Sequence, residues 1–150
     1  MEVISLMFSE HEKRQIIMEH YLYPYFKTEK ISNKSGINSY HHSRSCVDEI
    51  TLNYAKQQFT YEAKGCAIFI SACEIFLETL NQIGIQSLKN LMQAYKKLVL
   101  QTEKITNEEK QLLGQLNIYE NVKRHFNRIE CALMITYVLE KLESPELGLE

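Results

Sequence analysis

The chain has 150 residues, a length that predicts a single domain, residues 1–150, with one hydrophobic core. Hydrophobic residues make up 45% of it and charged residues 24%, a composition that excludes an intrinsically disordered chain. The formal net charge of -2, without a polybasic cluster, argues against nucleic acid or anionic lipid as a partner. No stretch approaches the ~20 apolar residues of a membrane span, and the N-terminus lacks a basic region and a cleavage site, so we expect a cytoplasmic protein.

The N-terminal part of the chain predicts one amphipathic helix and then a polar loop. Ser9 and Glu12 have the spacing of a capping box, and Pro24 ends the helix that follows them. The next segment, residues 27–45, is rich in Ser and Asn and contains a glycine. We interpret it as a loop that leads into an edge strand at residues 39–44.

An antiparallel hairpin is predicted next, because every second side chain is apolar on both sides of a short polar turn. This alternation covers residues 50–54 and 59–63, and the turn lies at residues 56–58. Such a period of two is typical of strands with one buried face.

The period changes to that of helices after Cys66. Residues 66–84 are apolar on most sides and end at Gly84, which predicts a buried helix. Residues 88–99 follow helical spacing, a second capping box stands at residues 106–109, and residues 119–142 are predicted to continue as a helix. Strands that precede helices indicate an α+β fold, with a small, about three-stranded antiparallel sheet packed against several helices on one side.

Four cysteines are present, and in a reducing compartment they are expected to be metal ligands, reactive thiols or small buried side chains rather than disulfides. None of them forms a Cys-x-x-Cys pair. Cys73 lies inside the apolar helical segment, where packing explains it best. Cys46 and Asp48 stand at i and i+2, so on extended backbone both side chains lie on one face.

The predicted topology brings further donors toward Cys46 and Asp48. Cys66 ends the second hairpin strand and precedes a helix, where unpaired backbone N–H groups and the helix dipole favour a thiolate. Cys131 joins them only if the last helix packs against the edge of the sheet. Three thiolates and one carboxylate would make a four-coordinate zinc site.

Three segments carry a resemblance to a known family. "SCVDEI" (residues 45–50), "KGCAIFISAC" (64–73) and "RIECALMITYVLEKL" (128–142) resemble, in this order, the three cysteine motifs of the iron-sulfur cluster assembly scaffold family, the IscU/NifU N-terminal-like proteins. The resemblance extends from the first helix to residue 142. The insertion at 101–116 and the Arg-x-x-Cys-Ala pattern at 128–132 are similar to the SufU-type branch, whereas IscU-type members have a histidine directly before the third cysteine.

The resemblance implies a zinc ion bound by Cys46, Asp48, Cys66 and Cys131, and a sulfur-accepting accessory protein rather than a stand-alone enzyme. Its sulfur would come as a persulfide from a pyridoxal-phosphate-dependent cysteine desulfurase, with Cys46 as the acceptor, released when a histidine of the desulfurase takes over one zinc position. An alternative is a scaffold that holds iron or a [2Fe-2S] cluster on the same ligands and passes it to recipient proteins. A second alternative is a structural zinc-binding interaction domain.

The first motif departs from the family pattern Asn-Pro-x-Cys-Gly-Asp. Arg44 and Ser45 replace Asn-Pro, and Val47 replaces the glycine, so we expect a different loop if the family loop needs a positive φ at that glycine.

Three charged or titratable residues near the motifs have two interpretations each. His41 and His42 point to opposite faces of the predicted strand, and solvated strand residues are the preferred interpretation over ligands. Arg128 is either a positive charge near the persulfide or an ordinary charge on the helix surface.

Overall fold

The structure is a computed structural model that describes residues 7–31, 36–43, 47–122 and 128–142. Its strands are β1 (Ile37–His42), β2 (Glu49–Ala55) and β3 (Gln58–Lys64). Its helices are α1 (Glu10–Leu22), α2 (Ala67–Ile83), α3 (Leu88–Leu100), α4 (Asn107–Leu113) and α5 (Arg128–Glu140). Two short 3₁₀ segments are η1 (Ile85–Ser87) and η2 (Gly114–Tyr119).

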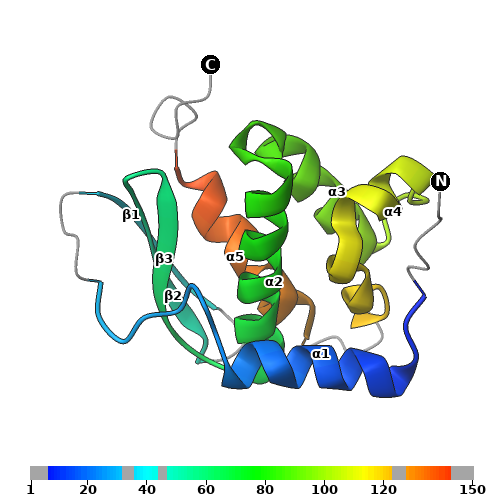
Figure 1. The fold of residues 1–150 in the computed structure, drawn as a ribbon, viewed down its shortest axis with the longest axis horizontal. Coiled ribbons are helices and arrows are strands. Elements are labelled where there is room, and N and C mark those ends of the chain that lie inside the picture. Colours follow the sequence, from blue (N-terminus) through cyan, green and yellow to red (C-terminus); the bar gives the residue numbers. More distant parts are fainter. Residues whose placement is uncertain (1–6, 32–35, 44–46, 123–127, 143–150) are drawn as a thin grey trace.

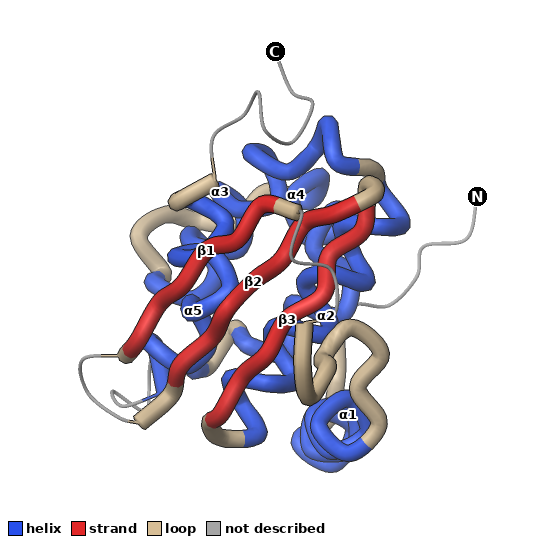
Figure 2. Tube along the Cα trace, turned by 90° about the vertical axis from the view of Figure 1, so that its left-hand side faces the viewer, coloured by secondary structure: helices blue, strands red, loops and turns tan. Residues whose placement is uncertain are grey.

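The sheet is antiparallel in the order β1-β2-β3, and the helices cover one of its faces (Figure 2). Helix α2 runs through the middle of the molecule with α5 beside it, and α5 packs against α2, β1 and β2 (Figure 1). The Ser39 hydroxyl on β1 donates a hydrogen bond to the Val138 carbonyl of α5 at 2.8 Å, which ties the last helix to the edge strand. The predicted α+β class is confirmed.

The β2–β3 hairpin is confirmed, with a tighter turn than predicted. Ala55 pairs with Gln58, so the loop consists of two residues, Lys56 and Gln57. Both have positive φ, 53° and 62°, which is the left-handed geometry of a two-residue turn between twisted strands. The edge strand β1 begins two residues earlier than predicted, and residue 44, its predicted end, lies outside the described residues.

Both predicted capping boxes are present. The Ser9 hydroxyl accepts a hydrogen bond from the Glu12 N–H, and the Glu12 carboxylate accepts one from the Ser9 N–H, both at 3.1 Å. Thr106 and Glu109 make the same pair of hydrogen bonds, also at 3.1 Å. Gly84 ends α2 with φ of 96°, a conformation that L side chains rarely adopt. The caps therefore fix where these helices begin and end.

The helix predicted over residues 119–142 is wrong in its first part. Residues 114–119 form the 3₁₀ segment η2 and residues 120–121 form a turn, whereas α5 begins at Arg128. The Asn117 side chain holds this geometry because it donates hydrogen bonds to the carbonyls of Lys110 and Gly114, at 2.9 and 2.7 Å. The buried Tyr119 hydroxyl lies 2.6 Å from the Ser71 hydroxyl of α2, so tertiary contacts override the helical pattern.

The core lies between the sheet and α2, with α3, α5 and η2 around it. Most of α2 is buried, as the apolar pattern of its sequence predicts. No helix in the described residues is long and apolar enough to cross a membrane alone. Helix α2 and residues 85–100 together have the length and composition of a membrane span, but the chain bends by 116° between them.

The chain between α1 and β1 is anchored by the buried Glu74 of α2. Its carboxylate accepts hydrogen bonds from three successive backbone N–H groups, at residues 25–27, and from the Tyr61 hydroxyl of β3. The shortest distances are 2.5, 3.0 and 3.1 Å for the three N–H groups and 2.6 Å for the hydroxyl. A full set of donors thus compensates the burial of this charge.

Candidate metal centre

Asp48 lies at the end of the β1–β2 connection, directly before β2. The connection closes through the Ser43 N–H, which donates to the Asp48 carbonyl at 2.8 Å. The next residue, Glu49, already pairs with His42 on one side and Lys64 on the other. The sheet therefore fixes the backbone of Asp48, and its side chain is only 2% exposed.

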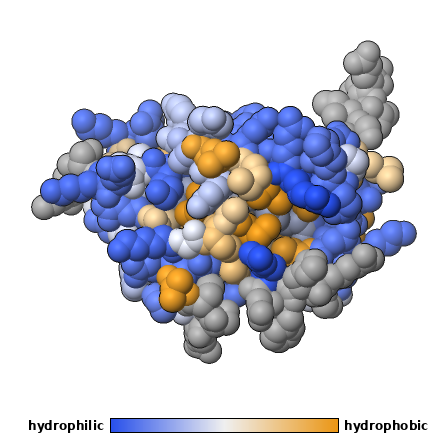
Figure 3. Space-filling model, turned by 90° about the horizontal axis from the view of Figure 1, so that it is seen from below, coloured by the Kyte–Doolittle hydropathy of each residue, from blue (hydrophilic) through white to orange (hydrophobic). Residues whose placement is uncertain are grey.

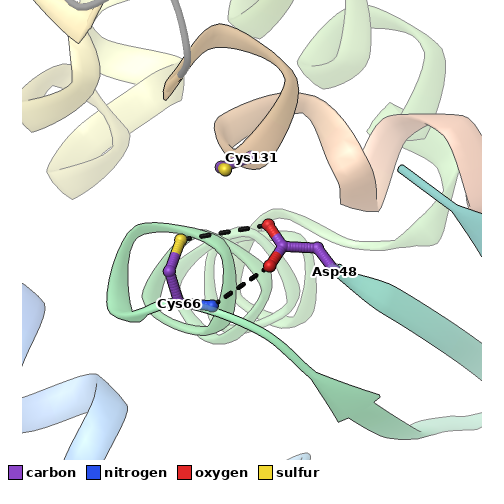
Figure 4. A group of neighbouring side chains, drawn as sticks. All are labelled: Asp48, Cys66 and Cys131. Carbon is purple, nitrogen blue, oxygen red and sulfur yellow. Dashed lines mark hydrogen bonds between the residues drawn. The ribbon is translucent and has the colours of Figure 1, made fainter. Parts of the chain in front are cut away.

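Cys66 occupies the N-cap position of α2, at the junction where β3 leads into the helix. Its backbone is extended, with φ of -78° and ψ of 170°, and its side chain makes no capping hydrogen bond. The Asp48 side chain binds the N-terminal end of α2 instead, because its Oδ1 accepts a hydrogen bond from the Cys66 N–H at 3.3 Å (Figure 4). The Cys66 thiol faces the other carboxylate oxygen, Oδ2, at 3.9 Å.

Cys131 lies in the first turn of α5 and is buried. The packing of α5 against α2 and the sheet brings its thiol to the carboxylate and the Cys66 sulfur (Figure 4). One ligand atom from each of Asp48, Cys66 and Cys131 lies within 4.8 Å of the other two. The sequence analysis predicted that Cys131 joins the other donors only if the last helix packs against the sheet, and α5 does pack there.

The surroundings of Cys131 and Cys73 raise the pKa of both thiols. Burial, then the hydrogen bond to Asp48 and the proximity of Cys66, raise the pKa of the Cys131 thiol well above its usual range. Burial also raises the pKa of the Cys73 thiol, with Glu74, Asp48 and Cys66 adding to the effect. A coordinated divalent cation reverses this situation, since a metal-bound thiol is deprotonated.

The donor set fits zinc or a thiolate-bound iron. Two sulfurs and one carboxylate oxygen are ligands of tetrahedral zinc sites, whereas calcium and magnesium take oxygen ligands. Zn–S bonds of about 2.3 Å and Zn–O bonds of about 2.1 Å place tetrahedral ligand atoms about 3.6–3.8 Å apart. Donors within 4.8 Å of one another therefore need to approach by little more than about 1 Å. A fourth ligand would complete the coordination.

The first cysteine motif lies partly outside the residues that the structure describes. Arg44, Ser45 and Cys46, the predicted sulfur acceptor and fourth ligand, fall outside the described residues. Val47 is described and is 82% exposed. The ligand role of the first cysteine therefore stays a prediction.

The other residues considered as candidates lie in different surroundings. The His41 ring packs against Tyr137 of α5 at a tilt of 46°, with ring centroids 4.9 Å apart, and its Nδ1 lies 3.2 Å from the Lys141 amino group. His42 and Arg128 are exposed, and Cys73 is fully buried in the core.

The sequence motifs did not single out Gly65, which lies beside the candidate ligands. Gly65 lies directly before Cys66, and a Cβ added to it would lie 2.4 Å from Asp48 Oδ1. A glycine at a strand-to-helix junction next to a candidate ligand is the signal that could have identified it.

Comparisons with known proteins agree with the fold. A crystal structure of a putative iron-sulfur cluster assembly scaffold protein for the SUF system, from Fervidobacterium islandicum AW-1, superposes with a TM-score of 0.69 at 24% identity, over 89% of this chain and 94% of that one. The N-terminal part of a NifU-like protein from Brucella abortus gives 0.67 at 14% identity, over 89% and 92%. A structure described as a hypothetical protein gives 0.74 at 16% identity, over 89% and 97%.

These matches show that the chain has the fold of the IscU/NifU-like iron-sulfur scaffold proteins. At these identities the similarity concerns the fold. No protein-family model matches the sequence, and no curated protein matches it.

Proposed function

We propose that the protein is a SufU-like member of the iron-sulfur cluster assembly scaffold family, which binds zinc and accepts sulfur from a cysteine desulfurase. The observation that carries this proposal is the convergence of Asp48, directly before β2, Cys66, directly before α2, and Cys131, on α5, on one point. The same three positions stand in the three sequence motifs that resemble the family. Cys46, from the first motif, is proposed as the fourth ligand.

Zinc at this site would supply charge that keeps the cysteine sulfurs deprotonated. In the sulfur-accepting step, Cys46 attacks the terminal sulfur of the desulfurase persulfide. A bond from Cys46 Sγ to that sulfur forms, the sulfur–sulfur bond of the desulfurase breaks, and the electron pair stays with the desulfurase cysteine as a thiolate. The product is a persulfide on Cys46, ready for transfer to a recipient protein.

The proposed partners are a pyridoxal-phosphate-dependent desulfurase and cluster recipient proteins in the cytoplasm. Support comes from the fold shared with a putative scaffold protein for the SUF system. The face viewed in Figure 3 supports docking, because apolar surface gathers in the middle of it, bordered by hydrophilic side chains. Val47, directly before Asp48, is an exposed apolar side chain that a partner docked at the site can contact.

The second candidate function is a scaffold on which a [2Fe-2S] cluster is assembled and passed on. The observation that favours it is the same donor set, since thiolates are the common ligands of such clusters. The third, a structural zinc domain, is favoured by the altered motif at residues 44–47. Transfer of radiolabelled sulfur from a SufS-type desulfurase tests the first candidate, and anaerobic cluster reconstitution separates the second from the third.

The metal site is tested with two matched cysteine variants. Zinc affinity, measured by competition with a chelator, is expected to fall at least about 100-fold in Cys66→Ala. Cys73→Ala removes a buried thiol of α2 that lies outside the group of three donors, and it is expected to retain the affinity of the natural protein. Full zinc affinity in Cys66→Ala would show that this thiol is not a ligand.

Sulfur acceptance is tested with Cys46→Ala. This variant is expected to keep the fold and to accept no labelled sulfur. If it accepts as much sulfur as the natural protein, the zinc site has a structural role. If the natural protein accepts no sulfur but forms a transferable cluster under anaerobic reconstitution, the scaffold function replaces the proposed one.

A further inference from the structure

Gly65 leaves no room for a side chain. A Cβ built on it would lie 2.4 Å from Asp48 Oδ1 and 2.8 Å from Asp48 Cγ. It would also lie 2.3 Å from Cδ2 of the Phe69 ring. We infer that Gly65 is a positioning residue of the metal centre, which lets the Asp48 carboxylate approach the N-terminus of α2 and so sets how this carboxylate binds the ion.

The requirement for glycine here is one of space. The described glycines with positive φ are Gly84 and Gly114, and Gly65 is not among them, so an alanine could adopt its backbone conformation. The two close contacts differ in what can move. Phe69 is fully buried, so its ring has no free volume, whereas the Asp48 carboxylate can turn about its own bonds.

The close approach divides the two oxygens of Asp48 between two tasks. Oδ1 accepts the hydrogen bond of the Cys66 N–H, and Oδ2 lies on the side of the Cys66 sulfur. Asp48 therefore offers one oxygen to the ion, which suits four-coordinate zinc, rather than the two oxygens typical of larger coordination shells. A methyl group at residue 65 turns the carboxylate away, breaks its hydrogen bond and withdraws Oδ2.

This inference rests on the proposed metal-binding function and adds a residue that itself carries no ligand atom. Gly65→Ala is expected to lower zinc affinity about 10–100-fold, as loss of an outer-shell partner does, and to change the absorption spectrum of the cobalt-substituted site. The probes are Zn²⁺ in a chelator competition and Co²⁺ in a direct titration.

The matched control is Gly36→Ala. Its Cβ would lie 2.6 Å from Ala55 Cβ and 2.7 Å from the Tyr54 carbonyl, a comparable clash at the opposite end of the β1–β2 ladder from Asp48. This control is expected to lose stability and to keep zinc affinity and the cobalt spectrum. A fall in affinity in Gly36→Ala equal to that in Gly65→Ala would assign the effect to general destabilisation and overturn the inference.

The dependence on Asp48 is tested in a second background. In a background that carries both Asp48→Ala and Phe69→Leu, the further change Gly65→Ala is expected to leave zinc affinity unchanged, because the carboxylate that it displaces is absent and the ring contact is relieved. If Gly65→Ala alone does not fold, Gly65→Ala with Phe69→Leu relieves the ring contact and keeps the clash with Asp48.

Two failures are distinguishable. If the natural protein binds neither Zn²⁺ nor Co²⁺, the proposed function fails. If it binds both and Gly65→Ala has the same affinity and the same cobalt spectrum, the metal site stands and only the role of Gly65 is overturned.

Discussion

Two equally buried carboxylates, Asp48 before β2 and Glu74 on α2, have opposite surroundings. Asp48 and Glu74 are each 2% exposed. Glu74 accepts hydrogen bonds from three backbone N–H groups and one tyrosine hydroxyl, all within 3.1 Å. Asp48 faces one backbone N–H at 3.3 Å and the thiols of Cys66 and Cys131, which are weak donors.

The difference shows what separates a structural carboxylate from a candidate ligand. A buried charge surrounded by its full set of donors anchors the chain and has no further capacity. A buried charge beside two sulfurs has an oxygen that a cation can use, and the sulfurs are donors for the same cation. Burial alone therefore does not distinguish the two, whereas the chemistry of the neighbours does.

The largest effect is expected on zinc affinity in Asp48→Asn. The amide keeps an oxygen for the Cys66 N–H but lacks the negative charge, so the affinity measured by chelator competition is expected to fall about 100-fold or more. The metal-free variant is expected to be at least as stable as the natural protein in urea, because a buried negative charge beside two thiols is removed. Unchanged zinc affinity would place Asp48 with Glu74 among the structural carboxylates.

Glu74→Gln is expected to have the opposite profile. The new amide NH2 group cannot accept a hydrogen bond from the backbone N–H groups that face it. The free energy of unfolding in urea titrations is therefore expected to fall by about 2–3 kcal/mol. Zinc affinity of the folded protein is expected to remain that of the natural chain. A loss of zinc affinity without a loss of stability would remove the contrast between the two carboxylates.

The raised pKa values of the Cys131 and Cys73 thiols predict that the stability of the metal-free protein depends on pH. In the metal-free fold the pKa values of the Cys131 and Cys73 thiols are raised, whereas unfolded thiols titrate near about 8.5. The folded state then binds more protons than the unfolded state above that pH. The stabilisation is complete below about pH 8.5 and falls as pH rises, by up to about 1.4 kcal/mol per pH unit for each thiol.

Urea titrations between about pH 7.5 and 9.5 measure this slope below the ordinary range of tyrosine. The zinc-loaded protein is expected to show a smaller slope, because a coordinated thiol has already lost its proton. Equal slopes with and without zinc would show that Cys131 does not bind the metal.

The smallest effect is expected in Glu78→Gln, one turn after Glu74 on α2. The Glu78 carboxylate is about half exposed and lies 3.1 Å from Nε2 of His20 on α1. Exposed pairs of this kind contribute about 0–1 kcal/mol, so unfolding free energy and zinc affinity are expected to change little. A loss as large as that in Glu74→Gln would show that exposure does not separate these two positions.

Most of the fold follows from local patterns of the sequence. Capping boxes at Ser9 and Thr106, the alternation in the hairpin and the apolar helix after Cys66 predicted the element types, because each depends on neighbours within a few residues. The prediction was wrong at residues 119–122, where the helical period is present. There the buried Tyr119 and the side chain of Asn117 impose a different backbone.

For the candidate site, the sequence determined which side chains were available: three thiols and one carboxylate in motifs of recognisable order. Only the tertiary structure decided that Asp48, Cys66 and Cys131 meet, because their meeting depends on α5 packing against α2 and the sheet. It also decided that Glu74 is an anchor and that Gly65 makes room for a carboxylate. These are contacts between residues far apart in the chain or defined by excluded volume, and no local period of the sequence records them.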